Sequence, residues 1–206
     1  MEFYDVINKR SSIRDFDNEF IDKDTIKRII DAAYKAPSND HLKDYHFIVV
    51  TDKTIAAKVI DAIPKSFTDK EIDEFLTFAN NDIQRNAYKS AIPKQHRMLL
   101  DASVLIIPLM KKKSDIMHPD NLSSLNCFAT IWCSIENMWL AATSEGYGCN
   151  LRIPMEGEES QARNILGFSE NYLMPCFFAI GKPSCDAKKC KQIDYNLDEL
   201  IHYNKF

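Results

Sequence analysis

The chain has 206 residues, of which 45% are hydrophobic, so it can bury a full core but is short for two domains. We expect a single domain over residues 1–206. The formal net charge is −4 with no basic stripe, which argues against a nucleic-acid-binding protein. No charged-then-apolar signal opens the chain, and the longest apolar run, Ala102 to Met110, is far shorter than the ~20 residues of a membrane span. A cytoplasmic protein that does not bind membranes is therefore expected.

The N-terminal half alternates helical and strand-like patterns. Asp24 to Tyr34 repeats apolar side chains at helical spacing, with Asp22 or Asp24 available as the N-cap. Tyr45 to Thr51 is rich in β-branched residues, which is typical of a strand, and Thr54 to Ile63 returns to helical spacing. From Phe67 to about Tyr88 a polar stretch has apolar residues on one side, which predicts a helical excursion that could cover a site.

The second half is more apolar. Ala102 to Leu109 predicts a buried strand, and Cys176 to Ile180 predicts another that is closed by Gly181. Leu125 to Glu145 is apolar on nearly all sides, so a helix there must be buried at the centre of the domain, at a subunit interface, or both. The polar tail Leu197 to Phe206 carries aromatic anchors and is expected to pack on a partner.

The six cysteines do not form a disulfide framework or a metal-binding pattern. Cys127, Cys133, Cys149 and Cys176 lie in apolar surroundings and are expected in the core. The pair in the polar tail has neither C-x-x-C nor zinc-ribbon spacing, and the five histidines are scattered without an H-E-x-x-H pattern. No metal site is expected.

Glycine placement narrows the possible cofactor sites. All five glycines lie in the last third of the chain, the first being Gly146. Since glycine adopts positive φ without strain, the preceding residues cannot supply a Walker A loop or an N-terminal G-x-G-x-x-G fingerprint. A nucleotide phosphate would have to be held by side chains such as Arg10, Ser12 and Arg14.

Two motifs near the N-terminus point to such a site. Lys9 to Phe16 offers two guanidiniums and two hydroxyls, a suitable set for a phosphate monoester, although an Arg-Ser cluster is often only a solvated helix face. Ala36 to Phe47 offers short hydrogen-bonding side chains behind Pro37, which stops the preceding helix. In their order and separation, the two motifs resemble the opening signatures of the FMN-dependent nitroreductase family.

Two later motifs extend the resemblance over nearly the whole chain, with Phe67 to Gln95 the least assignable part. Ile153 to Glu159 precedes a helix predicted over Ser160 to Leu166 and resembles the family's Pro-x-Glu-Gly stretch, where backbone groups reach the N5 and O4 edge of the flavin. Alternatively, it is an ordinary loop before an acidic helix. Gly181-Lys182-Pro183, with the lysines that follow, resembles the family's C-terminal pattern, in which basic residues complete the phosphate site.

The resemblance implies an α+β nitroreductase-like fold with a mixed central sheet flanked by helices, a long buried central helix, and a C-terminal tail that packs on the partner subunit of a homodimer. It implies bound FMN, with NADH or NADPH as electron donor, and a small conjugated oxidant such as a nitroaromatic or a quinone, reduced by ping-pong exchange. A specialised relative (a dehalogenase or a metabolite oxidase) and a non-catalytic FMN reservoir or sensor are the alternatives.

The flavin would carry the chemistry, so no catalytic side chain is expected. One of Lys189 and Lys191 is expected at the phosphate. Lys43 stands where the family commonly has glutamine, and Lys43 or Arg97 could supply a cation near the flavin N1 and C2=O, where reduction places negative charge. The residues that the resemblance assigns to FMN are Arg10, Ser11, Ser12, Arg14, Pro37, Ser38, Asn39, His41, Lys43, Pro154, Met155, Glu156, Gly157, Lys189 and Lys191.

Overall fold

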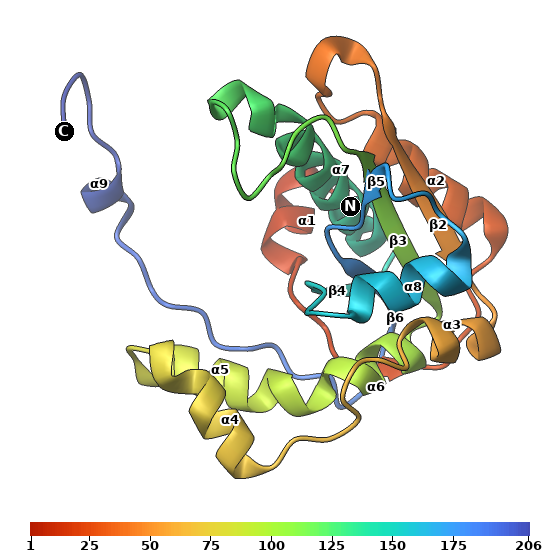
Figure 1. Ribbon diagram of the computed structural model, residues 1–206. Helices are drawn as coiled ribbons and strands as arrows, with labels where there is room; N and C mark the ends of the chain where they lie inside the picture. Colours follow the sequence, from red (N-terminus) through yellow and green to blue (C-terminus); the bar gives the residue numbers. More distant parts are fainter.

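The computed structural model describes residues 1–206 (Figure 1). The elements, in chain order, are α1 (Phe3–Lys9), β1 (Phe16–Asp17), α2 (Lys23–Tyr34), β2 (Tyr45–Val50), α3 (Lys53–Val59), α4 (Asp69–Phe75), α5 (Asp82–Ala91), α6 (Gln95–Asp101), β3 (Val104–Lys111), α7 (Asn126–Ser144), β4 (Gly148–Arg152), α8 (Glu158–Leu166), β5 (Tyr172–Leu173), β6 (Phe177–Pro183) and α9 (Leu197–Leu200). Short 3₁₀ helices lie at Asn39–His41, Leu76–Phe78, Ile92–Lys94 and Leu122–Leu125.

The sheet is built around β3 and β6. Its strands follow the order β1-β6-β3-β2, with β4 also paired to β6 and β5 to β3. All of these pairs are antiparallel. The parallel component expected of a mixed sheet is reduced to a single bridge between Ser12 and Cys149.

Strand β3 is buried on both faces, so the fold has three layers, with the sheet between two sets of helices. Seven of its eight residues are buried, so its sequence is a continuous apolar run rather than an alternating one. Ile106 and Met110 face a cluster with α2 and α7, whereas Leu105 and Ile107 face a second cluster with α3, α6 and α8. Helices therefore cover both faces of the sheet (Figure 1).

Helix α7 is the long central helix expected from Leu125 to Glu145. It packs against α1, α2, β3 and β4, and the side chain of Asn137 donates to the backbone carbonyl of Ala32 in α2. One stripe stays exposed, and Cys133 lies on it, which corrects its expected place in the core. Cys127 is half-buried, and only Cys149 and Cys176 of the four expected core cysteines are fully buried.

Two predicted boundaries are corrected. Helix α3 ends at Val59, earlier than the predicted Ile63. Strand β6 runs through Gly181 to Pro183 instead of closing at the glycine, and Gly181 pairs with Gly148. A Cβ at Gly181 would lie 2.9 Å from the Phe16 ring, so this glycine permits close packing rather than ending the strand.

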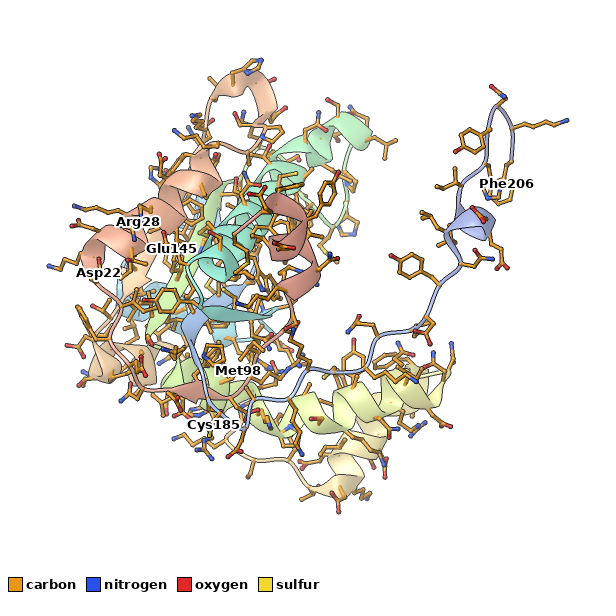
Figure 2. The ribbon with its side chains drawn as sticks, turned by 180° about the vertical axis from the view of Figure 1, so that it is seen from behind. Asp22, Arg28, Met98, Glu145, Cys185 and Phe206 are labelled. Atoms are coloured by element: carbon orange, nitrogen blue, oxygen red, sulfur yellow. The ribbon has the colours of Figure 1, made fainter.

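Two parts of the chain extend from the domain. Helices α4 and α5 form an arm with a small core of its own around Ile72 and Leu76 (Figure 1). The C-terminal tail runs past this arm and carries Phe206 far from the domain (Figure 2). Its large apolar side chains, including Tyr195, Leu197 and Tyr203, are exposed. No helix is long and apolar enough to cross a bilayer.

Candidate functional site

The first signature segment is held against β4. The backbone N–H of Ile13 donates to the carbonyl of Cys149 at 3.0 Å, and the Ile13 side chain enters the core against Gly148. Because neighbouring residues of an extended segment point to opposite sides, Ser12 and Arg14 face away from that core. The Lys94 ammonium pairs with Asp15 at 2.6 Å and so joins the end of the segment to the start of α6.

A cavity of about 230 Å³ lies beside this segment, and we name it the Arg14 pocket. The arm that was expected to cover a site forms one of its walls through α5. The tail forms another wall. The lining residues are Ser11, Ser12, Arg14, Ala87, Tyr88, Ala91, Cys190 and Gln192.

Arg14 has unused hydrogen-bonding capacity in this pocket. Its Nη1 lies 3.6 Å from the Cys190 sulfur, and its Nε is buried without any hydrogen-bond partner. A buried N–H without an acceptor is costly, and a guanidinium binds phosphate or carboxylate oxygens well. The pocket therefore fits an anionic group, with the hydroxyls of Ser11 and Ser12 as further donors.

The other basic residues of the predicted phosphate site lie apart from Arg14. The Arg10 guanidinium lies 5.2 Å from the centre of the Trp139 ring on α7, a cation–π contact. The Lys189 ammonium lies 3.4 Å from the carbonyl of Lys9 and lines a separate cavity of about 180 Å³, which shares Ser11 with the Arg14 pocket. The Lys191 side chain is exposed. The tail residue that contacts Arg14 is Cys190.

The second signature segment has an unusual backbone. Asp40, His41 and Lys43 adopt φ values of 52°, 56° and 50°, a region that costs non-glycine residues energy. The absence of glycine here therefore does not prevent left-handed turns. Asn39 N–H donates to Thr130 Oγ1 at 2.9 Å, which fixes the segment on α7.

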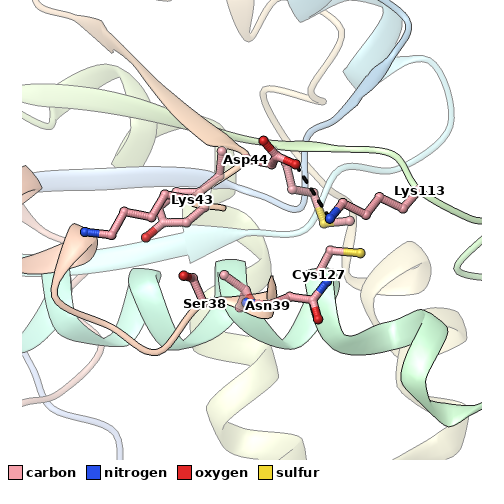
Figure 3. Close-up of a pocket in the computed structure, with 9 residues that line it drawn as sticks. Ser38, Asn39, Lys43, Asp44, Lys113 and Cys127 are labelled. Atoms are coloured by element: carbon pink, nitrogen blue, oxygen red, sulfur yellow. Dashed lines mark hydrogen bonds and ion pairs between the residues drawn. The ribbon is translucent and has the colours of Figure 1, made fainter. Parts of the chain in front are cut away.

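Lys113 supports this segment from the loop after β3. Its ammonium lies 3.4 Å from Asp40 and 3.6 Å from Asp44. Desolvation lowers the pKa of Lys113, but the two carboxylates together outweigh this effect and raise the pKa above its ordinary value. Figure 3 shows Lys113 directed at Asp44 above Ser38 and Asn39, whereas the Lys43 ammonium points away from them. The Lys43 side chain is exposed in the single chain.

The third signature segment is an exposed turn between β4 and α8. Gly157 has a φ of +84° and precedes α8, while the side chains of Ile153 and Met155 are exposed. The N–H groups of Glu156 and Gly157 make no hydrogen bond within the chain. Pro154 also borders a cavity of about 770 Å³, together with Phe128.

Sequence patterns did not reveal the residues behind this turn. Arg152 and Glu158, at its two ends, form a buried ion pair, and Arg152 also contacts Gln95 of α6. The only available signal was an arginine two residues before the Pro154–Gly157 stretch and a glutamate directly after it. Arg97, the other candidate cation, is 83% exposed and pairs with Asp101 at 2.8 Å, so its charge is already compensated.

The sheet, the buried central helix and the signature segments define an α+β domain of the nitroreductase type. The chain belongs to the nitroreductase family, whose model matches residues 7–182.

Individual relatives support this assignment and differ in activity. An iodotyrosine deiodinase of Haliscomenobacter hydrossis is 28% identical over 130 residues, a match that covers 62% of this chain and 54% of that protein. An NADPH-dependent oxidoreductase of Staphylococcus aureus is 20% identical over 206 residues, which cover 98% of this chain and 73% of that one. A crystal structure of oxidised iodotyrosine deiodinase bound to FMN and 3-iodo-L-tyrosine superimposes with a TM-score of 0.75 at 16% identity, with both chains covered completely.

Proposed function

We propose that this protein is an FMN-dependent oxidoreductase that uses NADH or NADPH to reduce a small conjugated acceptor, such as a nitroaromatic or a quinone, by ping-pong exchange. The main support for the proposal is the state of Arg14. Its buried Nε has no hydrogen-bond partner, and it lies in a pocket that Ser11 and Ser12 also line. The similarity to an NADPH-dependent oxidoreductase and to a deiodinase that binds FMN supports the same class of reaction.

The residues fit FMN in both of its polar regions. Arg14, Ser11 and Ser12 would hold the phosphate, with Arg10 or Lys189 adding charge from the neighbouring surface. The free N–H groups of Glu156 and Gly157 would serve as donors to the ring edge, and fixed donors there stabilise negative charge. When bound, FMN would supply two-electron transfer between the nicotinamide and the acceptor, so no side-chain nucleophile is required.

The experiment that tests this proposal is the visible spectrum of the purified protein before and after each nicotinamide is added without oxygen. We expect FMN, not FAD, to be released on denaturation, and we expect the bound flavin to bleach with NADH or NADPH. A flavin that stays oxidised with both donors would favour a reservoir, a sensor or an oxidase reduced by its own substrate. A protein that binds no flavin would refute the proposal.

We also propose a homodimer with two shared sites. Asn39 is fixed near the start of α7 at Thr130, whereas Arg10 lies on Trp139, nine residues further along, which is about 13 Å at 1.5 Å per residue. One chain therefore keeps its first two signature segments apart. A partner docked on the exposed stripe of α7 could bring its own Ser38–Lys43 segment toward the Arg14 pocket of this chain.

Reductive dehalogenation is the second candidate, because the match to an iodotyrosine deiodinase has the higher identity of the two relatives above. In this reaction a carbon–iodine bond is replaced by carbon–hydrogen, with two electrons and one proton consumed and iodide released. Enzyme reduced with dithionite would be mixed with 3-iodo-L-tyrosine or with a nitroaromatic. Rapid flavin reoxidation with stoichiometric iodide would support the deiodinase, whereas reoxidation by the nitroaromatic alone would support the nitroreductase.

A further inference from the structure

One buried guanidinium joins the turn of the third signature segment to the rest of the domain. Arg152, the last residue of β4, is 7% exposed, and Glu158, the first residue of α8, is 3% exposed. Arg152 Nε donates to Glu158 Oε2 at 2.9 Å, and Nη2 donates to Oε1. Two parallel hydrogen bonds fix the direction of both side chains as well as their separation.

The Glu158 carboxylate also shapes the turn that it closes. Its Oε2 accepts a second hydrogen bond, from the backbone N–H of Met155 at 3.1 Å, while the N–H of Glu158 donates to the carbonyl of Met155 at the same distance. The polar backbone groups of Met155 are thereby used inside the turn. The next two N–H groups, those of Glu156 and Gly157, have no hydrogen-bond partner in the chain.

The same guanidinium reaches a third element. Arg152 Nη1 lies 3.4 Å from the side-chain oxygen of Gln95, and the Gln95 amide donates to the carbonyl of Ala91 at the end of α5. Ala91 lines the Arg14 pocket. A chain of contacts therefore runs from the turn that offers free N–H groups to the wall of the pocket that fits a phosphate.

We propose that Arg152 and Glu158 are positioning residues for the flavin. They hold the Glu156 and Gly157 N–H groups at a fixed separation from the Arg14 pocket, and they keep the buried charge behind this turn balanced. This inference rests on the proposed function. The proposed effect of these two charges on the flavin follows from their burial. A buried charge that has lost its partner is weakly screened, so it acts strongly on neighbouring groups.

The test uses full-length protein and measures two quantities besides turnover: the Kd of the apoprotein for oxidised FMN, and the midpoint potential of the bound flavin. In E158Q the Arg152 cation is uncompensated, which favours reduced flavin. In R152M the Glu158 anion is uncompensated, which disfavours it. We expect the ratio of the Kd values for oxidised and reduced FMN to rise at least tenfold in E158Q and to fall at least tenfold in R152M, which corresponds to about 30 mV in opposite directions.

The double variant R152M/E158L separates position from charge, and it serves as the decisive variant if a single variant does not fold. It removes both charges, so we expect the midpoint potential of the wild type, but Kd values at least tenfold higher in both oxidation states because the turn has lost its anchor. R28M/E145Q is the matched control, because it removes a bidentate ion pair between α2 and the end of α7. It should leave the Kd values and the midpoint potential unchanged.

The outcomes are distinct. Folded R152M/E158L with the FMN affinity of the wild type would show that the pair only stabilises the fold and would overturn the inference. So would single variants whose potentials shift in the same direction. A wild-type protein that binds no FMN would instead refute the proposed function.

Discussion

At the scale of single residues, the candidate site depends on which charges lack a partner. Arg14 is partly buried and keeps an unpaired Nε, so an anion would gain a desolvated hydrogen bond there. Arg97 is exposed and already paired, and Lys43 is exposed and directed away from its neighbours. An anionic ligand would therefore gain more binding free energy from Arg14 than from Arg97 or Lys43.

Arg14→Ala should lose most of its FMN. Removing one charged partner of a desolvated phosphate costs on the order of 2–5 kcal/mol, so Kd should rise about 30-fold or more. Fluorescence titration of the apoprotein measures this change. Arg163→Ala, which removes a guanidinium on α8 that donates to the backbone carbonyl of Ser169, is the control and should bind FMN normally. Full FMN occupancy in Arg14→Ala would contradict the assignment.

Lys43→Gln tests whether this lysine tunes the flavin. If its ammonium lies near the flavin in the assembled dimer, its removal should lower the two-electron midpoint potential by tens of millivolts, since about 30 mV corresponds to 1.4 kcal/mol. Arg97→Gln is the matched control, and its potential should not change because Asp101 already compensates Arg97. An unchanged potential in Lys43→Gln would mean that Lys43 is only a surface residue.

At the scale of elements, close contacts between backbones position the signature segments. The Arg10–Arg14 segment lies against β4 because Gly148 leaves room for Ile13, and a Cβ at Gly148 would be 2.8 Å from the Ile13 side chain. Ion pairs fix the helices in a similar way. Arg28 of α2 donates two hydrogen bonds to Glu145 at the end of α7, beside Asp22 (Figure 2).

Gly148→Ala should reduce both stability and FMN affinity. The added methyl must displace Ile13, and overpacking of this kind costs about 1–3 kcal/mol. The same displacement moves Ser12 and Arg14. Gly167→Ala is the control. Its φ of +73° strains alanine by about 1–2 kcal/mol, but an added Cβ would have no neighbouring atom within 4 Å, so no side chain is displaced. Denaturant unfolding should show a loss in both variants, but only Gly148→Ala should bind FMN more weakly.

Glu145→Gln should make stability less dependent on pH. The hydrogen bond from Arg28 lowers the pKa of Glu145 below its ordinary value of 4.5. A lowered pKa in the folded state stabilises the protein above the unfolded-state pKa, and this contribution disappears as the pH falls through the folded-state pKa. For an exposed pair the loss should be at most about 1 kcal/mol at pH 7. Thermal unfolding of the two proteins should therefore differ at pH 7 and converge once the pH falls below the folded-state pKa of Glu145.

At the scale of the whole molecule, the single chain leaves apolar surface uncovered. Phe3, Tyr4 and Ile7 of α1, a helix that packs against α7, are exposed, and the tail adds further apolar side chains. Groups of exposed large apolar side chains are typical of an interface. The projecting tail is long enough to reach beyond its own domain (Figure 2).

Truncation after Gln192 should weaken the dimer. We expect full-length protein to have twice the chain mass of 23.7 kDa in light scattering, with an interface above about 2,000 Å². Without residues 193–206, the concentration at which the dimer dissociates should rise at least tenfold, because the apolar contacts of the tail are lost. Lys205→Gln, which removes only a charge from the tail, should remain dimeric. A flavin-loaded monomer of the full-length chain would contradict the proposed shared site.

Elements with strong periodicity can be predicted from the amino-acid sequence alone. Helix α2 begins after its Asp22 cap, and α7 and β3 were predicted from unbroken apolar patterns, because such patterns report burial on each side of one element. The four motifs, read in order, were enough to indicate the family. Short β4 and α6 were not predicted, because a few residues of mixed polarity carry no distinct period.

Contacts between side chains that are distant in the sequence depend on how the elements pack in three dimensions. Gln95 and Arg152 are 57 residues apart, and Arg14 and Cys190 are 176 apart, so no local pattern relates them. The tail contributes Cys190 to the Arg14 pocket, whereas the Lys189 ammonium lies at the carbonyl of Lys9, because successive side chains of an extended segment point to opposite sides. Local periodicity is a property of the chain, whereas contacts at a site depend on how separate elements pack together.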